Sequence, residues 1–446
     1  MHRQTIYRIY GPAFVSGLLY IFLAYFTPRT QFWQLLFLVS SCFGLYVFLC
    51  RQPLDFRTGL GIAIFLRLIF TWAIPVLSDD YFRFFWDGTL WLQGENPFLQ
   101  LPSYYLEKGH RVNGLTQTLY HKLNSPHYYS VYPPACQYLF ALVKMLAGAN
   151  IYQYCVLLRL FIIAAEAGSL LVLRRILQQL DLPEKQLWYY GLNPLVILEL
   201  TGNLHFEAFL IFFLLISLYY LLQSRTTLAA VTFSIAITVK LLPLVFLPPL
   251  LKFLGWKRFI VFTGLVAGVV FLSFLPFMSL ALIQHLGESI NLYFQKFEFN
   301  ASIYYLLRWL GYLVSGYNLI AFIAPLLGTI VFFTIIYLTA KFRKEDYNLI
   351  RVFLLSLSVY FLLATVVHPW YLTILVALTS LTYFKYPLVW SFAAVLSYSA
   401  YQTATYEENL YLIALEYILV FTMLIYEFNN VRKDSRTLPK KTLAEK

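Results

Sequence analysis

Apolar residues occur along this chain in repeated runs of roughly 16–22 positions, separated by short charged or polar segments. A helix that is apolar on all sides is typical of a membrane span, because a helix at a water-facing surface needs one polar face. The pattern predicts an all-α, polytopic integral membrane protein with about 12–14 transmembrane helices. The expected spans lie near residues 12–27, 31–50, 58–77, 154–173, 186–201, 204–222, 227–240, 241–255, 259–278, 318–340, 348–367, 370–384, 387–402 and 409–428.

One further apolar stretch, residues 132–149, does not fit a simple crossing. If it and the run at 154–173 both crossed, the basic pair Arg174 and Arg175 would lie on the outer side. Basic residues favour the cytoplasmic side, so we expect residues 132–149 to form an interfacial or re-entrant helix.

Prolines lie within predicted spans in two places, and those that follow Lys240 indicate broken helices. Asn193-Pro194 lies within a span, where asparagine can satisfy a carbonyl group that proline frees. Lys240 is followed by further breakers: Pro243, Pro248 and Pro249.

The distribution of charge predicts how the chain is oriented. Its 446 residues are 60% hydrophobic and 12% charged, with a formal net charge of +12. Basic clusters alternate with the spans and gather in the tail, whereas residues 78–153 contain five basic and five acidic residues. By the positive-inside rule, both termini are cytoplasmic and the balanced segment faces outward. These charges set topology and contact anionic lipid, and they argue against nucleic-acid binding.

The same pattern predicts one transmembrane catalytic domain, residues 1–428, and a basic cytoplasmic tail, residues 429–446. The outer catalytic loop covers about residues 78–152, and a second outer loop covers about 279–317. The first apolar run is followed at once by further spans, so it is expected to be an anchor rather than a cleaved signal peptide. The four cysteines show no paired spacing, which favours inert buried thiols.

A polar stretch, residues 78–88, directly follows an apolar run. Ionisable groups at the mouth of a span are costly to desolvate and usually mark a site. We predict that one of the adjacent carboxylates Asp79 and Asp80 accepts a proton from an attacking hydroxyl, while the other tunes its pKa or positions the acceptor. A helix N-cap or a solvated loop is the alternative.

The segment that follows these carboxylates contains three further candidates: Arg83, Trp86 and Asp87. Arg83 either holds the donor phosphate or pairs with a carboxylate. Trp86 either stacks on a sugar ring or anchors the chain at the interface. Asp87 is predicted to contact the sugar or the acceptor, although Asp87-Gly88 also suits a simple turn.

Polar residues from later segments are expected at the same outer face. Lys240 either neutralises a phosphate or snorkels to an interface. His368, at the outer end of a span, either donates to a phosphate oxygen or is structural. His205 and Glu207, two positions apart between spans, are predicted to make polar contacts with a sugar. Such convergence from distant positions indicates an active site rather than chance.

Two loop segments combine aromatic and polar residues around Tyr132 and Asn300. They suit sugars and isoprenoid chains, so both residues are predicted sugar or acceptor contacts; an ordinary interfacial belt is the alternative. Histidines and carboxylates also suggest a metal, but the chain has no HExxH motif or tight ligand spacing. We therefore predict no metal or other cofactor, with a divalent ion as the alternative.

Several motifs follow one another in a fixed order: Asp80-x-x-Arg83-x-x-Trp86-Asp87-Gly88, Gly94-x-Asn96-Pro97-Phe98, Tyr132-Pro133-Pro134, Asn193-Pro194, Gly202-Asn203-x-His205-x-Glu207, Lys240-Leu241-Leu242-Pro243, Asn300-x-Ser302 and His368-Pro369-Trp370-Tyr371. This series, over about residues 77–371, resembles the polyprenyl-phosphate-sugar-dependent glycosyltransferases of the GT-C superfamily. The likeness is strongest to bacterial mannosyltransferases that use polyprenyl-phosphate-mannose. It implies a base at Asp80, a donor-phosphate contact at His368 and a place near the donor for Lys240. Glu207 departs from the aspartate expected in many relatives.

We therefore expect an inverting glycosyltransferase that moves a sugar, by resemblance mannose, from a polyprenyl-phosphate donor to an acceptor hydroxyl on the outer face. Its partners are the lipid-linked donor, a lipid, glycan or protein acceptor, and membrane lipids, without nucleic acid. A lipid-linked sugar flippase or transporter is an alternative, but it would show inverted repeats and ionisable groups near the midplane. A glycan ligase or polymerase is another. Compact loops and the lack of sorting signals suggest a bacterial cytoplasmic (inner) membrane.

Overall fold

The computed structural model of the chain describes residues 3–295, 297–403 and 405–434. Within these ranges the regular structure is helical, apart from one isolated parallel bridge between Phe299 and Val366. The all-α fold class is therefore confirmed. The α-helices are α1 (Arg3–Tyr25), α2 (Phe32–Cys50), α3 (Phe56–Leu68), α4 (Asp80–Leu92), α5 (Gln117–Tyr120), α6 (Pro134–Ala147), α7 (Ile151–Gln179), α8 (Leu187–Gly191), α9 (Pro194–Val196), α10 (Glu207–Leu222), α11 (Thr226–Val239), α12 (Leu247–Leu254), α13 (Trp256–Phe274), α14 (Leu280–Gln295), α15 (Ile303–Ser315), α16 (Ile320–Lys341), α17 (Asp346–Leu363), α18 (Leu372–Thr379), α19 (Tyr386–Ala393) and α20 (Leu410–Asp434).

Six helices of the described chain are long and apolar enough to cross a membrane: α1, α2, α7, α13, α16 and α20. A bent pair adds a seventh, and five further apolar segments are shorter, at 10–17 residues. The chain is thus a multi-pass membrane protein. The predicted count of 12–14 spans is reached only if the shorter segments also cross. Prolines explain part of the shortening, since Pro248 and Pro249 lie in the first turn of α12.

The bent pair carries His205 at its break. It consists of Pro194–Gly202, which ends in the π-helix Ile197–Gly202, and α10, and its two halves are inclined by 114°. The Asn193 side chain caps the first half by accepting hydrogen bonds from the two amides that follow Pro194. The structure therefore replaces the two separate spans predicted near 186–201 and 204–222 with one broken unit.

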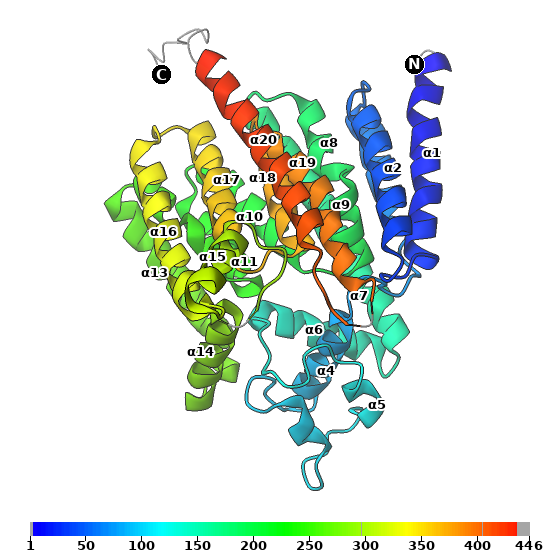
Figure 1. The fold of residues 1–446 in the computed structure, drawn as a ribbon, viewed down its shortest axis with the longest axis vertical. Helices are drawn as coiled ribbons and strands as arrows, with labels where there is room; N and C mark the ends of the chain where they lie inside the picture. The colour runs from blue at the N-terminus through cyan, green and yellow to red at the C-terminus, as the bar shows by residue number, and fades with distance from the viewer. Residues whose placement is uncertain (1–2, 296, 404, 435–446) are drawn as a thin grey trace.

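The predicted first outer loop, about residues 78–152, is folded into helices rather than open. In Figure 1, α4, α5 and α6 lie at the end of the bundle opposite to the start of α1 and the end of α20. The turn proposed at Asp87-Gly88 is wrong, because both residues lie inside α4. A Cβ on Gly88 would lie 2.6 Å from the carbonyl oxygen of Phe140, so glycine permits α4 to pack closely on α6. The helix expected at residues 132–149 is α6.

The second outer loop, predicted at 279–317, is also largely helical and contains α14 and α15. It contacts the segment that leads to His368. The Phe299 amide donates to the Thr365 carbonyl at 3.1 Å, and the Val367 amide donates to the Phe299 carbonyl at 2.8 Å. At the other end of the chain, α20 ends at Asp434, so residues 435–446 of the predicted basic tail lie outside the described residues.

Candidate active site

Two adjacent carboxylates at the start of α4 have different partners. Asp79, directly before the helix, forms an ion pair with Arg29, with 2.6 Å between Oδ2 and Nη1. Asp80, in the first turn, accepts a hydrogen bond from the Asn124 side chain through Oδ1. The first turn of a helix favours a negative charge. The other oxygen of Asp80, Oδ2, lies on the side of His205.

His205 lies in the break of the bent pair and faces Asp80. Its Nδ1 is 3.0 Å from the backbone oxygen of Glu199 and 3.3 Å from Glu199 Oε2, so this nitrogen carries a proton. Its Nε2 is 3.9 Å from Asp80 Oδ2 and has no hydrogen-bond partner among the described residues, although the side chain is only 3% exposed. A buried nitrogen left unpaired is costly. Nε2 thus lies on the side of the His205 ring that faces Asp80.

Trp370 brings a second imidazole to the site. The rings of His205 and His368 both stack on its indole, with centroid distances of 4.0 and 4.3 Å and interplanar angles of 17° and 4°. His368 Nδ1 also lacks a hydrogen-bond partner in the described part of the chain. Burial, followed by the Lys240 ammonium and His205, lowers the pKa of His368 to about 3. The ring is therefore neutral near pH 7, with one N–H donor and one acceptor nitrogen.

Lys240 directly follows α11 and supplies the cation of the site. Its Nζ lies 2.5 Å from Oε1 of the buried Glu207, at the start of α10, and 3.5 Å from the centre of the Tyr371 ring. An ammonium group carries three protons. The ion pair with Glu207 uses one of them, so Lys240 keeps donors for an anionic ligand.

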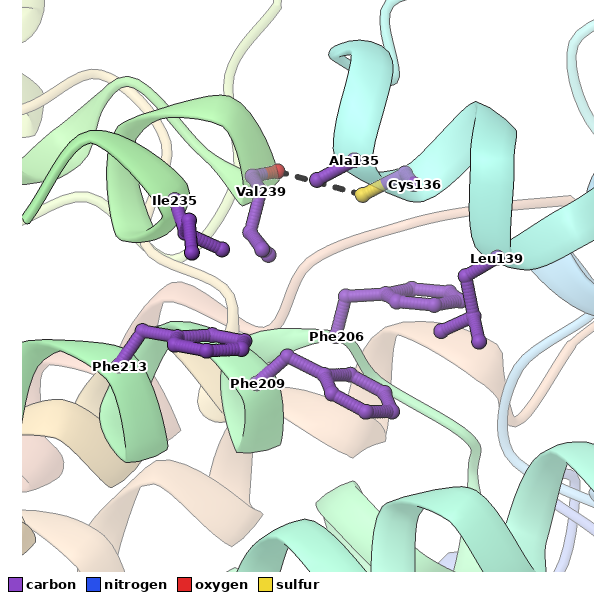
Figure 2. Close-up of a pocket in the computed structure, with 8 residues that line it drawn as sticks. All are labelled: Ala135, Cys136, Leu139, Phe206, Phe209, Phe213, Ile235 and Val239. Carbon is purple, nitrogen blue, oxygen red and sulfur yellow. Dashed lines mark hydrogen bonds between the residues drawn. The ribbon is translucent and has the colours of Figure 1, made fainter. Parts of the chain in front are cut away.

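An apolar pocket of about 170 Å³ lies beside this ion pair (Figure 2). Phe206 and Val239 line it and directly precede Glu207 and Lys240 in the chain, so part of the pocket wall adjoins the charged groups. Phe206 also packs on Phe84 of α4, with 4.9 Å between ring centroids. The pocket therefore offers room for an apolar group next to a cation. It is lined by Ala135, Cys136, Leu139, Phe206, Phe209, Phe213, Ile235 and Val239.

Three predicted site residues, Arg83, Trp86 and Asp87, are packed inside the segment predicted as the first outer loop. Arg83, only 2% exposed, has its Nε 2.8 Å from Asp87 Oδ1 and donates from Nη1 to the carbonyl oxygens of Ser125 and Tyr128. Trp86 is fully buried in a small core of the loop. The structure does not bring these side chains to the space beside Asp80, and the pairing of Arg83 with a carboxylate matches the alternative reading of that residue.

Two other predicted contacts lie at the edges of the site. Tyr132 is half-buried, with its ring edge-on to Phe84 of α4 at 5.1 Å. Asn300 is buried, with its Nδ2 3.2 Å from Glu416 Oε1 and 3.4 Å from the Val367 carbonyl oxygen. Since Val367 directly precedes His368, Asn300 bears on the position of that histidine. Sugar or acceptor contacts by Tyr132 and Asn300 stay predictions.

Sequence reasoning missed a buried ionic network behind the site. Glu166 of α7 pairs with Arg67 of α3, with 2.7 Å between Oε1 and Nη2, and accepts a hydrogen bond from the Thr201 hydroxyl. Arg159 of α7 donates to the carbonyl oxygens of Thr201, at 2.8 Å, and Gly202, at 3.2 Å. These bonds hold the end of the π-helix. Ionisable residues inside the predicted spans were the available signal.

Further contributors were missed for two reasons. Glu199 lies within the predicted span at 186–201 and carried the same signal as the ionic network. Arg29 and Asn124 lie in connections without a distinctive pattern, where only tertiary contacts identify them. Among the described residues, those that sequence reasoning left out of the site include Arg29, Asn124, Glu199, Trp370 and Tyr398, whose hydroxyl donates to Glu199 Oε1.

The polar groups of the site are arranged as ion pairs and hydrogen bonds. Within the described ranges, no three His, Cys, Asp or Glu side chains form a group that could hold a metal ion. The arrangement suits proton transfer to a carboxylate and stabilisation of an anion by an ammonium and an imidazole. A reaction without a metal stays a prediction.

A family model described as "Alpha-(1->6)-mannopyranosyltransferase, N-terminal domain" matches residues 13–256, more than half of the chain. The matched range includes Asp80, His205 and Lys240, and it ends before His368. No match was found among curated proteins.

Proposed function

This chain belongs to the alpha-(1->6)-mannopyranosyltransferase family, and we propose that it transfers mannose from a polyprenyl-phosphate donor to an acceptor hydroxyl, with inversion at the anomeric carbon. That it is a mannosyl glycosyltransferase follows from the family. One observation carries the finer proposal. Asp80, His205, His368 and Lys240 converge beside an apolar pocket, which places a base, two imidazoles and a cation next to room for an isoprenoid chain.

Asp80 is the general base of the proposed reaction. The proton of the acceptor hydroxyl passes to Asp80, the acceptor oxygen bonds to C1 of mannose, and the bond from C1 to the phosphate oxygen breaks. Attack from the side opposite to the phosphate converts a β-linked donor into an α-mannoside. The family's description supports an α-(1→6) linkage, so we propose the 6-hydroxyl of an acceptor sugar as the nucleophile. General base catalysis typically contributes about 10²–10⁴-fold.

The leaving phosphate binds between Lys240 and His368. Lys240 keeps donors beyond its bond to Glu207, and His368 has an unpaired ring nitrogen. Donors held in place where negative charge develops stabilise the transition state, so the phosphate leaves without a strong acid. Arg83, expected as a further cation here, is engaged by Asp87, and we assign it to holding α4 within the loop.

The apolar pocket takes the part of the donor nearest its phosphate. An apolar cavity of about 150 Å³ lined by aliphatic and aromatic side chains binds benzene, and this pocket measures about 170 Å³. One five-carbon isoprene unit is similar in size to benzene. An apolar subsite beside the cation favours a lipid-linked donor over a sugar nucleotide.

We also propose that the site faces outward from a bacterial cytoplasmic membrane. The helices α4–α6 lie at the end of the bundle opposite to the start of α1 and the end of α20 (Figure 1). The basic clusters predict that the latter end is cytoplasmic. A lipid-linked donor fits this orientation, because no sugar nucleotide then needs to cross the membrane.

A donor comparison tests the proposal. Purified protein in lipid nanodiscs is incubated with an α-mannooligosaccharide acceptor and radiolabelled mannose on either polyprenyl phosphate or GDP. We expect transfer from the lipid donor alone, and an α-(1→6) linkage in the product by NMR. Transfer from GDP-mannose at an equal rate would contradict the donor, and a β-linked product from a β-linked donor would contradict inversion.

A further inference from the structure

Glu199 is fully buried in the π-helix and has no part in the reaction steps above. Its Oε1 accepts a hydrogen bond from the Tyr398 hydroxyl. Its Oε2 lies 3.2 Å from Asn203 Nδ2 and 3.3 Å from His205 Nδ1, and its backbone oxygen lies 3.0 Å from the same Nδ1. Glu199 thus presents two acceptors to one edge of the imidazole.

The backbone that carries Glu199 is held from behind. Arg159 donates to the carbonyl oxygens of Thr201 and Gly202, and Glu166 accepts from the Thr201 hydroxyl. Leu204 has φ +64°, in the left-handed region that non-glycine residues rarely adopt. π-Helical turns and strained residues persist where surrounding contacts fix them, and they are frequent at functional sites. These contacts therefore fix the backbone that positions the His205 ring.

We propose that Glu199 is a positioning residue that holds Nδ1–H of His205 inward, so that Nε2 binds a hydroxyl of the transferred mannose beside Asp80. The inference rests on the proposed function, which makes a sugar the ligand here. A hydroxyl that accepts from Nε2–H and donates to Asp80 Oδ2 fits the 3.9 Å between these atoms. A carboxylate has about four acceptor positions, so Asp80 can still receive the acceptor proton.

The charged groups around His205 favour a ring that donates from both nitrogens. Glu199 faces it from the π-helix, Glu207 from α10, Asp80 from α4, and His368 lies across Trp370. Burial lowers the pKa of His205, but the hydrogen bond and charge of Glu199, with the charges of Glu207 and Asp80, raise it above its ordinary value. The donating form is present at low pH and is lost as pH rises through this pKa.

Glu199→Gln keeps the side-chain shape and removes the negative charge. We expect the KM for the lipid donor to rise about tenfold with a smaller change in kcat. The alkaline limb of the kcat/KM profile should move to lower pH by about one unit or more. Glu199→Asp keeps the charge and should retain the wild-type pH profile. Glu184→Gln, at an exposed ion pair with Arg174, is the matched control and should change neither quantity.

Wild-type KM and pH profile in a folded Glu199→Gln variant would overturn the proposal. Histidine-ring NMR adds a readout that needs no donor, with the His205 signal identified by its absence from His205→Gln. Its titration midpoint should fall by about one pH unit or more in Glu199→Gln, and an unchanged midpoint overturns the inference. A wild-type protein that transfers no mannose contradicts the proposed function, while the titration still decides the role of Glu199.

Discussion

Lys240 has two roles in this account, and a single substitution would remove both at once. Its ammonium neutralises the buried carboxylate of Glu207, and in the proposed reaction it also binds the donor phosphate. Glu207 is buried while Lys240 is partly exposed, so removing the ammonium leaves a buried carboxylate without its counter-ion, which is destabilising. Loss of activity after such a change would report folding and phosphate binding together, so the two must be separated.

A double variant separates these interactions. Lys240→Met should lower both the melting temperature and the transfer rate, because Glu207 loses its counter-ion. Lys240→Met combined with Glu207→Gln should recover the melting temperature but remain about tenfold or more below wild type in kcat/KM for the lipid donor. Thermal melts in detergent and initial rates measure the two effects. If the transfer rate recovers together with the melting temperature, Lys240 only neutralises Glu207 and does not bind the donor phosphate.

His368 contributes a hydrogen bond rather than a charge, because its pKa of about 3 keeps the ring neutral near pH 7. His368→Gln preserves a neutral donor and should keep most of the affinity for the lipid donor. His368→Leu removes that donor and should raise the donor KM about tenfold. Equal losses in the two variants would argue against a hydrogen bond to the phosphate.

Helix α4 presents Asp80 because it is held against α6. Phe84 stacks on Phe140, with 4.8 Å between ring centroids, and one turn further along Gly88 meets the backbone of Phe140. Arg83 and Asp87 tie the same helix to the segment before α6, because Arg83 donates to the Ser125 carbonyl oxygen and Asp87 accepts from the Ser130 hydroxyl. The position of Asp80 therefore depends on close contact along one face of α4.

Adding a methyl group at Gly88 tests this packing. In Gly88→Ala, the new Cβ would lie 2.6 Å from the Phe140 carbonyl oxygen, so we expect α4 to shift and the free energy of unfolding to fall by about 1–3 kcal/mol. The transfer rate should fall as well. Gly264→Ala in α13 is the matched control, since nothing lies within 4 Å of its added Cβ. Wild-type stability and rate in Gly88→Ala would contradict the packing.

Helices could be predicted from the sequence where the local pattern of apolar residues is enough to specify them. Long apolar runs predicted α2 within one residue of its observed bounds, and they predicted the apolar part of α7 and α20, which both extend past the predicted ends at 173 and 428. The turn given as an alternative for Asp87-Gly88 is wrong, since glycine is common in turns but its role here depends on contact with α6, which follows much later in the chain. The bend before α10 was also missed, because the contacts that fix it come from α7.

The whole molecule assembles its site from four separate parts of the chain. The start of α4, the break before α10, the end of α11 and the segment before α18 carry Asp80, His205, Lys240 and His368. Sequence reasoning expected these residues at one face, because ionisable groups beside membrane spans need a common polar site. Sequence reasoning could not show that Trp86 is buried within the loop rather than at the site. The sequence of α4 does not reveal which of its side chains the rest of the loop covers.

Orientation in the membrane belongs to the molecule as a whole. Lys108→Cys in the predicted first outer loop and Lys185→Cys after α7 both replace exposed side chains. On intact bacterial spheroplasts, a membrane-impermeant maleimide should label Lys108→Cys, whereas Lys185→Cys should be labelled only after permeabilisation. The wild-type protein, with its four native cysteines, serves as the background. The reverse pattern would place the site on the cytoplasmic side.

The most direct test of the account is the transfer rate of Asp80→Asn compared with Asp79→Asn. Both variants remove one negative charge at the start of α4, but only Asp80 faces His205. With polyprenyl-phosphate-mannose in lipid nanodiscs, Asp80→Asn should lower kcat by about 10²–10⁴-fold, while Asp79→Asn should stay within about tenfold of wild type. A folded Asp80→Asn variant that transfers mannose at the wild-type rate would contradict the assignment of Asp80 as the base.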